Sequence, residues 1–301
     1  MRRIWVIIGM VVLFGGCTRT KMHYGTGYYA PAWSPDGRRI YYFRNDLTVK
    51  EIIPYGEGVQ YEYEKNEWYI CSCDTNGENR KEIYKVAEFK GKGGGGNMDV
   101  SPSGEIIYCF PKTKEGIWMM DTTGNNDHQI LFWGKNPRWA YNYTKIIFEG
   151  DSTHRGIWLM DKNGENVIQI LTEGSSPAFC DANEKVLYHI WPAEGYGMIY
   201  LYSFSDSSID TLVEGRNADW DDTGENFICN PKRGNYSLFH LPSGELFKEL
   251  PIAPGVNNIA RWIKNTIVAE SIDGIWVGKD DGRGYILILE NTGLHKPDTT
   301  Y

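Results

Sequence analysis

Short apolar runs, each bounded by turn residues, follow one another along most of the chain. The run Ile40–Phe43 comes after the turn segment Ser34–Gly37, and the run Ile146–Phe148 comes before the turn segment Lys162–Glu165. Asp-Gly and Asn-Gly pairs within these segments favour tight hairpin turns, because both tolerate the positive φ that such turns require. No helical periodicity follows the first sixteen residues. The pattern therefore predicts an all-β protein built from short antiparallel strands.

The strand pattern repeats along the chain. Gly116–Asp121 and Gly156–Asp161 match almost residue for residue, and a third copy begins at Gly274. A second recurring element precedes each copy and contributes one anchor residue; the six anchors are Trp33, Val100, Trp139, Phe179, Trp220 and Trp262. The last five anchors are 39, 40, 41 and 42 residues apart, whereas the first gap of 67 contains an insertion, Arg44 to Glu67, of roughly one strand pair.

Six repeats of about 40 residues, each with four short strands, are typical of a β-propeller. No single blade can cover both of its faces, and closing the ring covers them. We therefore predict a six-bladed β-propeller of four-stranded antiparallel blades over residues 29–290, with a C-terminal tail over 291–301. Trp139, Trp220 and Trp262 are expected to be buried where neighbouring blades meet.

The repeat also has a family likeness. Trp33-Ser34-Pro35-Asp36-Gly37 followed by a strand, and Ile157-Trp158-Leu159-Met160-Asp161 followed by a glycine turn, resemble the repeat of TolB-type, WD40-like β-propellers. The resemblance covers about residues 29–289 and implies the same fold. The TolB family carries an α/β domain before its propeller, and only Thr18–Tyr28 fills that space here. Docking to the Tol–Pal envelope system is therefore not carried over.

The N-terminus reads as an export signal. Arg2 and Arg3 precede an apolar run from Ile4 to Phe14, and Gly15-Gly16-Cys17 follows, which is the layout of a secretory signal over residues 1–16. This end resembles the lipobox of bacterial lipoproteins. The resemblance implies lipid attachment at Cys17, a lipidated tether over 17–28, and a membrane-anchored protein of the cell envelope, on the periplasmic side of the outer membrane or on the cell surface. An ordinary signal with an incidental Cys17 is the alternative.

The composition and the motif spacing argue against several other classes of function. The chain has 31 Lys and Arg against 39 Asp and Glu, a net charge of −8, whereas a nucleic-acid binder needs a basic face. We therefore expect no nucleic-acid partner. The chain shows no spacing typical of zinc ligands and no catalytic motif, so we predict no catalytic residue, no metal and no cofactor. Cysteines beyond Cys17 are read as small buried apolar residues rather than a disulfide framework: Cys71, Cys73, Cys109, Cys180 and Cys229.

Strand order predicts where binding residues gather. In a four-stranded meander the tight turns share one face, and the long loops and blade connections share the other. Aromatic and basic side chains on such loops suit binding. The candidate partner-binding residues are Tyr55, Tyr61, His154, Arg155, Trp191, Tyr196, Lys232 and Arg233. Ordinary solvated loops are the equal alternative. The function predicted is an envelope binding or scaffolding module with a protein, peptide or glycan partner. The alternative is an envelope hydrolase or lyase acting on a glycan or peptide at the channel mouth.

The residue just before each anchor carries an alternating charge. It reads Ala32, Asp99, Arg138, Ala178, Asp219 and Arg261 from the first repeat to the sixth. Equivalent positions on neighbouring inner strands lie close around a ring. We therefore predict two ion pairs between blades, Asp99 with Arg138 and Asp219 with Arg261, because a partly buried charge needs a partner. The alternative is that the two aspartates bind a cation or a polar ligand.

Overall fold

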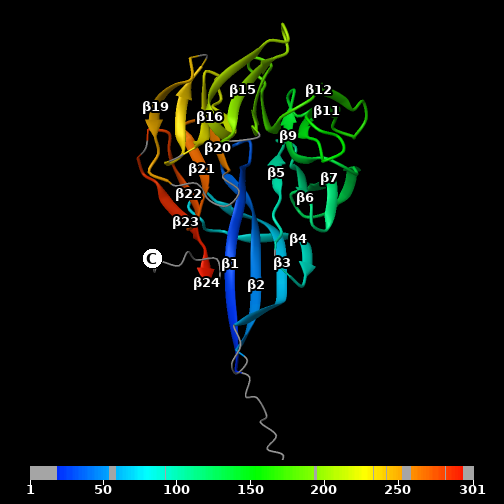
Figure 1. Ribbon diagram of the computed structural model, residues 1–301, viewed down its shortest axis with the longest axis vertical. Coiled ribbons are helices and arrows are strands. Elements are labelled where there is room, and N and C mark those ends of the chain that lie inside the picture. Colours follow the sequence, from blue (N-terminus) through cyan, green and yellow to red (C-terminus); the bar gives the residue numbers. More distant parts are fainter. Residues whose placement is uncertain are drawn as a thin grey trace, which may run out of the picture.

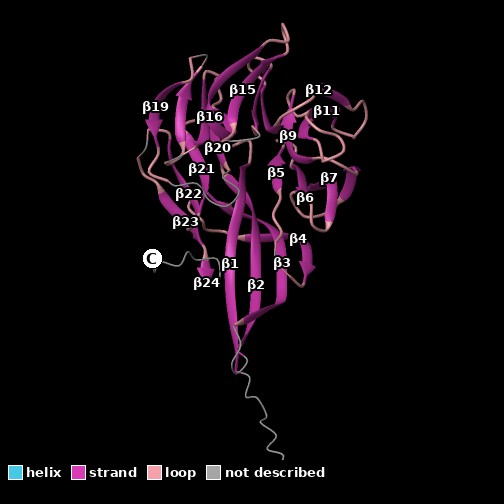
Figure 2. Ribbon diagram, in the orientation of Figure 1, coloured by secondary structure: helices cyan, strands magenta, loops and turns pink. Residues whose placement is uncertain are grey.

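A computed structural model of the chain describes residues 19–53, 59–91, 93–192, 195–232, 234–241, 243–252, 259–281 and 283–293. Cys17, Tyr55 and Arg233, all named above, lie outside the described residues. The described part contains strands, turns and loops and no helix (Figure 2). Every strand pairs with its neighbours in antiparallel fashion, and the all-β prediction is confirmed.

The strands form five hydrogen-bonded sheets (Figure 1). The first has five strands, β1 (Arg19–Trp33), β2 (Arg39–Ile53), β3 (Gln60–Asp74), β4 (Lys81–Phe89) and β24 (Thr292–Gly293). The second comprises β5 (Asn97–Val100), β6 (Glu105–Phe110), β7 (Lys114–Asp121) and β8 (His128–Leu131), and the third β9 (Lys135–Ala140), β10 (Lys145–Glu149), β11 (Ile157–Asp161) and β12 (Ile168–Leu171).

The remaining strands form a sheet of seven strands and one of four. The former comprises β13 (Ser175–Cys180), β14 (Lys185–Ile190), β15 (Met198–Ser203), β16 (Ile209–Trp220), β17 (Asn226–Pro231), β18 (Ser237–His240) and β19 (Glu245–Glu249). The latter comprises β20 (Ala260–Ile263), β21 (Thr266–Ser271), β22 (Gly274–Lys279) and β23 (Ile286–Glu290).

Strand β16 explains the sheet of seven strands. Its first part, to Glu214, pairs with β15, and its second part, from Gly215, pairs with β17. The chain therefore passes from the outer edge of the fourth repeat to the inner edge of the fifth without leaving extended backbone. The predicted four-stranded antiparallel unit is confirmed, but the predicted count of six blades is not: among the described residues three sheets have four strands, one has five and one has seven.

The anchor tryptophans lie between repeats, as predicted. Trp139 is 6% exposed and packs in one cluster with Ile107 of the second repeat and Phe148 of the third. Trp220 and Trp262 are equally buried, in clusters that join the fourth repeat to the fifth and the fifth to the sixth. Since these large side chains are shared between neighbouring sheets, apolar burial holds the repeats together as well as each repeat within itself.

The first and last repeats meet through direct hydrogen bonds. The indole of Trp33 donates to the carbonyl oxygen of Arg261 at 3.2 Å, and the backbone N–H of Tyr28 donates to Asn291 Oδ1 at 2.8 Å. Strand β24 pairs with β1 at Gly25 and Thr26, which places the end of the described chain beside its beginning (Figure 1). These contacts close the propeller without a covalent link.

Strands β1, β2 and β3 are 15 residues long each and project side by side from the rest of the molecule (Figure 1). We call their projecting part, residues 19–26, 47–53 and 60–66, the finger. The predicted insertion between Arg44 and Glu67 is thus an extension of the β2–β3 pair. The tether expected over 17–28 differs from what is observed, because from Arg19 onward the chain pairs with β2 as a strand of the finger.

The cysteines agree with the sequence interpretation. The five cysteines of the described residues, Cys71, Cys73, Cys109, Cys180 and Cys229, are buried and unbridged. Burial raises the pKa of the Cys73 thiol to about 11 and that of Cys71 to about 12, so these side chains stay uncharged at neutral pH. Within the part of the chain that the structure describes, no helix is long and apolar enough to cross a membrane.

Candidate functional site

Two cavities open where the inner strands of the repeats meet. One of about 320 Å³, which we call the loop-face mouth, is lined by residues that include Asn97, Lys135, Arg138, Glu149, Ser175, His189, Trp191, Arg216, Asn217 and Arg261. One of about 380 Å³, the turn-face mouth, is lined by residues that include Asp99, Arg138, Trp139, Tyr143, Asp181, Asp219, Asp221, Asp222, Arg261 and Lys264. Arg138 and Arg261 line both cavities, and the two arginines therefore stand between them.

Arg138 makes a charged bridge across the ring. Its Nε lies 3.1 Å from Asp99 Oδ2 and its Nη2 lies 2.8 Å from Asp219 Oδ1. The three side chains are no more than 18% exposed. Although burial alone would lower the pKa of the guanidinium, the two carboxylates raise it overall. The predicted pair of Asp99 with Arg138 is confirmed.

The predicted pair of Asp219 with Arg261 is wrong. Asp219 gives one oxygen to Arg138 and the other to the backbone N–H of Trp262, at 3.1 Å. Arg138, in the third repeat, contacts Asp99 of the neighbouring second repeat with its Nε. With its Nη2 it reaches across the channel to Asp219 of the fifth repeat. The alternative of a cation held by Asp99 and Asp219 is also not supported, since a guanidinium already occupies the space between them.

Arg261 is therefore left without a carboxylate. It is 6% exposed, and no carboxylate oxygen of the described residues lies within 4.0 Å of its guanidinium nitrogens. Nη2 donates to Asn97 Oδ1 at 3.1 Å and Nη1 to the carbonyl of Ala260 at 3.3 Å, while Nε has no hydrogen-bond partner among the described residues. Burial, together with the charge of Arg138, lowers its pKa to about 10. It stays charged at neutral pH.

A recurring hydrogen bond ties the inner strand of four repeats to the preceding repeat, three of them at the loop-face mouth. Ala30, Asn136, Ser176 and Asn217 stand at the same place in four repeats, three residues before the anchor, and all have φ between 47° and 51°. Their backbone N–H groups donate to a side chain of the preceding repeat: Glu270 Oε2, Cys109 Sγ, Glu149 Oε2 and His189 Nδ1, at 2.8, 3.3, 3.0 and 3.4 Å. Positive φ is unfavourable for these residues, so the bonds stabilise an otherwise strained bulge.

This arrangement decides the state of His189. A backbone N–H can only donate, so Nδ1 must accept, and the neutral ring then carries its proton on Nε2. Burial lowers the pKa of His189 to about 4, which keeps the ring neutral at physiological pH. A histidine with Nδ1 occupied and Nε2 protonated can donate a hydrogen bond, but it has no available lone pair for general-base catalysis.

Trp191, one of the residues predicted from the loops, lines the loop-face mouth, and Tyr196, another of them, packs against it. The rings of Trp191 and Tyr196 lie 6.0 Å apart in an edge-on arrangement, and Arg216 Cζ lies 5.6 Å and 5.3 Å from their centroids. Trp191 is 50% exposed. A cation held against two aromatic rings keeps all three side chains in place, and it leaves half of the indole open to solvent.

The other predicted residues lie elsewhere. His154 stacks on Trp133, with centroids 4.1 Å apart, and its Nδ1 lies 3.0 Å from Asp151 Oδ1. Arg155 is exposed, Lys232 forms an exposed ion pair with Glu214 at 3.3 Å, and Tyr61 lies on the finger opposite Glu51. None of these four residues lines the loop-face mouth.

The sequence interpretation missed Lys135, Arg216 and Glu149, which line the same mouth. A usable signal was present in the repeat. The position four residues before the anchor reads Tyr29, Gly96, Lys135, Ser175 and Arg216 in the first five repeats. The predicted ion pairs rest on the position next to the anchor alone, whereas the position four residues before the anchor carries the two cations Lys135 and Arg216.

The described residues do not form a metal-binding site. Within them no group of three or more His, Cys, Asp or Glu side chains is placed to hold a metal ion. The loop-face mouth brings together one histidine and one glutamate, and both already accept backbone hydrogen bonds.

Comparison with known proteins shows the fold. No family model matches the chain, and no curated protein matches it by sequence. Among solved structures, TolB from Acinetobacter baumannii is similar with a TM-score of 0.55 at 13% identity, over 83% of this chain and 77% of that one. An oligogalacturonate lyase in complex with manganese is similar with a TM-score of 0.50 at 12% identity, over 86% and 90%.

A third solved neighbour is a puromycin-hydrolyzing peptidase from Mycobacterium tuberculosis, with a TM-score of 0.51 at 8% identity, over 90% of this chain and 54% of that one. At such identities the likeness shows a β-propeller with TolB-like neighbours and says nothing of activity, since one fold carries many functions.

Proposed function

We propose that this protein is a binding module of the cell envelope, anchored to a membrane through Cys17, which holds a protein, peptide or glycan partner at the loop-face mouth. TolB-like structural neighbours and the export signal predicted from the sequence support the envelope setting. The site itself rests on one observation, the rim cluster of Trp191, Tyr196 and Arg216.

The rim cluster has the properties of a binding anchor. Tryptophan, tyrosine and arginine dominate the energetics of protein interfaces, above all when their conformations are fixed before binding. Trp191 is held by two neighbours and yet is half exposed, so a partner can cover its open face at little loss of side-chain freedom. The cavity behind it supplies hydrogen-bonding groups from Ser175 and Asn217.

A hydrolase or lyase at the same mouth has less support. Such chemistry needs a group that can take a proton at neutral pH. His189 has its Nδ1 engaged by Asn217, and Glu149 accepts from the backbone of Ser176 and pairs with Lys135 at 2.8 Å. Both side chains already serve the contact between repeats.

Site-directed photocrosslinking tests the proposal. A photoreactive phenylalanine analogue placed at position 191, in the full chain in its native membranes, is expected to give a discrete crosslinked product. The same analogue at Phe132, which is 72% exposed and lies outside both mouths, serves as the matched control. Equal labelling from both positions, or none from position 191, would refute a partner site at this mouth.

A further inference from the structure

The loop-face mouth contains a positive charge that no carboxylate of the described residues balances. Arg138 and Arg261 stand at equivalent places in the third and sixth repeats, and both line the channel. Arg138 has two carboxylate partners, whereas Arg261 has none among the described residues. Burying an arginine without a counter-ion is unfavourable. A protein that only needed to fill this position could do so with an apolar side chain.

The surroundings of Arg261 favour an anion on the loop-face side. Lys135, Arg138 and Arg216 line that cavity together with Arg261, and Glu149 is its one acidic residue among the described lining. The turn-face mouth, which Arg261 also borders, is lined instead by five aspartates. An anionic group that enters the channel is therefore attracted to one mouth and repelled by the other.

Neutral donors complete the loop-face cavity. Asn97 lines it, with its Oδ1 accepting from Arg261, and the protonated Nε2 of a neutral His189 is a donor as well, whereas the hydroxyl of Ser175 already donates to Glu149. Planar guanidinium groups bind carboxylate and phosphate oxygens in a forked geometry. A cavity of about 320 Å³ matches one sugar or amino-acid residue rather than an extended polymer, at the lower end of ordinary ligand sites.

We propose that the loop-face mouth binds an anionic oxygen group of the partner, a carboxylate or a phosphate, with the guanidinium of Arg261 as its counter-charge. The inference rests on the proposed function, since it names the chemistry that the same mouth recognises. The anion supplies the partner that Arg261 lacks, and Trp191 at the rim covers the group that carries the anion.

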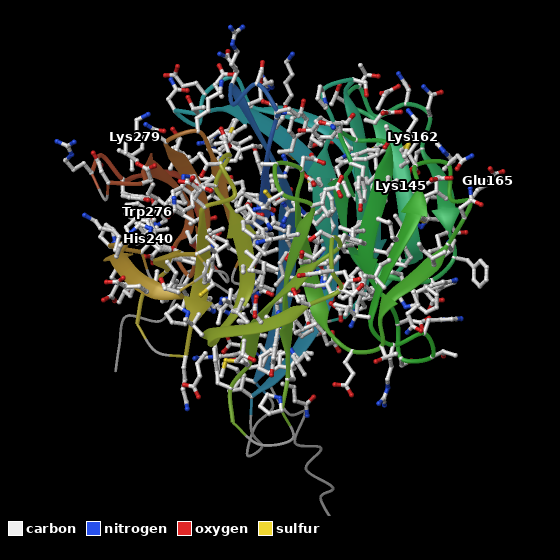
Figure 3. All side chains as sticks on the ribbon, turned by 90° about the horizontal axis from the view of Figure 1, so that it is seen from above. Lys145, Lys162, Glu165, His240, Trp276 and Lys279 are labelled. Carbon is white, nitrogen blue, oxygen red and sulfur yellow. The ribbon has the colours of Figure 1, made fainter. Side chains whose placement is uncertain are left out.

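Titration calorimetry on the purified full chain tests this, with glucuronate, glucose and inorganic phosphate as probes. Glucuronate or phosphate is expected to bind and glucose is not; glucuronate binding identifies a carboxylate site, and phosphate binding a phosphate site. Arg261→Gln is expected to weaken anion binding at least tenfold. Lys279→Gln, which removes one charge from the same repeat at the periphery, is the matched control and is expected to bind as the unaltered protein does (Figure 3).

Three outcomes would overturn the proposal: no binding of either anion, equal binding of glucose, or an Arg261→Gln protein that binds as before. A thermal melt accompanies each titration. Since Arg261 has no carboxylate partner among the described residues, Arg261→Gln is expected to remain folded, and a loss of binding then reports on the site itself. If crosslinking at position 191 succeeds while the anions fail to bind, the partner site stands and only its anionic chemistry is refuted.

Discussion

The two mouths of the channel are similar in size and opposite in charge. They share Arg138 and Arg261, but their other charged lining residues differ: the turn-face mouth adds five aspartates and Lys264, and the loop-face mouth adds Lys135, Arg216 and Glu149. Charge alone would mark the turn-face mouth as a cation site. Its hydrogen bonds give another explanation.

The aspartates of the turn-face mouth hold neighbouring repeats together. Each accepts a backbone N–H, from Trp139, Asn142, Trp262, Gly224 or Lys264, at 3.0, 2.9, 3.1, 2.9 and 2.8 Å; the acceptors are Asp99, Asp181, Asp219, Asp221 and Asp222 respectively. Most of these bonds cross from one repeat to the next. These hydrogen bonds explain why the turn-face mouth is acidic, whereas no carboxylate of the described residues balances the charge of Arg261. An unbalanced buried charge of this kind indicates a candidate site better than the number of charged residues does.

The largest expected difference is between substitutions of the two shared arginines, because Arg138 has a structural role and Arg261 is the proposed binding residue. Arg138→Met leaves Asp99 and Asp219 buried without a counter-charge, and we expect it to reduce the free energy of unfolding by about 3–5 kcal/mol. Arg261→Met removes a buried charge that has no carboxylate partner in the described part of the chain, and we expect an unchanged or raised denaturation midpoint. Urea unfolding of the two variants provides the measurement. Equal destabilisation by both would show that Arg261, like Arg138, is part of the framework.

Lowering the pH is expected to reduce the free energy of unfolding through His189, which lines the loop-face mouth. Its pKa of about 4 when folded lies below its unfolded value, so between these pH values only the unfolded chain binds the proton. Stability contributed by the neutral ring is therefore complete above about pH 6.5 and falls as the pH drops to about 4. The loss is about 3 kcal/mol, at 1.36 kcal/mol for each pKa unit.

His189→Asn isolates this effect, because Asn230 stands at the same place in the fifth repeat and an amide oxygen can accept the N–H of Asn217. The measurement is the difference in unfolding free energy between pH 7 and pH 4.5, in the variant and in the unaltered chain. Since the carboxylates titrate alike in both proteins, the variant should lose less stability than the unaltered chain. Parallel pH profiles would mean that His189 does not titrate as its burial implies.

The repeat made most of the fold predictable from the sequence. The anchors fixed the register, and Trp139, Trp220 and Trp262 are buried between repeats as expected. The sheet count was less accessible, because Gly215 stands at the same place in its repeat as Gly134 and Gly174, which have positive φ, and yet Gly215 is part of the continuous strand β16. The finger was partly visible as an insertion, but pairing of Arg19–Thr26 with β2 has no turn or spacing signal near the N-terminus.

The candidate site was predictable only in part. Trp191 and Tyr196 were found because long loops share one face, while His154 and Lys232 satisfied the same rule and lie elsewhere. The length of a loop predicts the face of the molecule on which its side chains lie, but it does not predict their distance from the channel axis. The pairing of Arg138 with two aspartates could not be read from neighbouring repeats, because it depends on the width of the ring.

The smallest expected effect belongs to a single carboxylate of the turn-face mouth. Asp222 is exposed, and its Oδ2 accepts the backbone N–H of Lys264, a residue with φ of 49°. Asp222→Ala removes that acceptor, but water can replace it at an exposed site, so we expect a loss of about 1 kcal/mol. Asp222→Asn keeps an acceptor oxygen and should stay within about 0.5 kcal/mol of the unaltered chain. Thermal unfolding of both variants separates hydrogen bonding from charge. If the asparagine variant lost as much stability as the alanine variant, the negative charge itself would matter at this mouth, and the aspartates would be more than acceptors for the backbone of the next repeat.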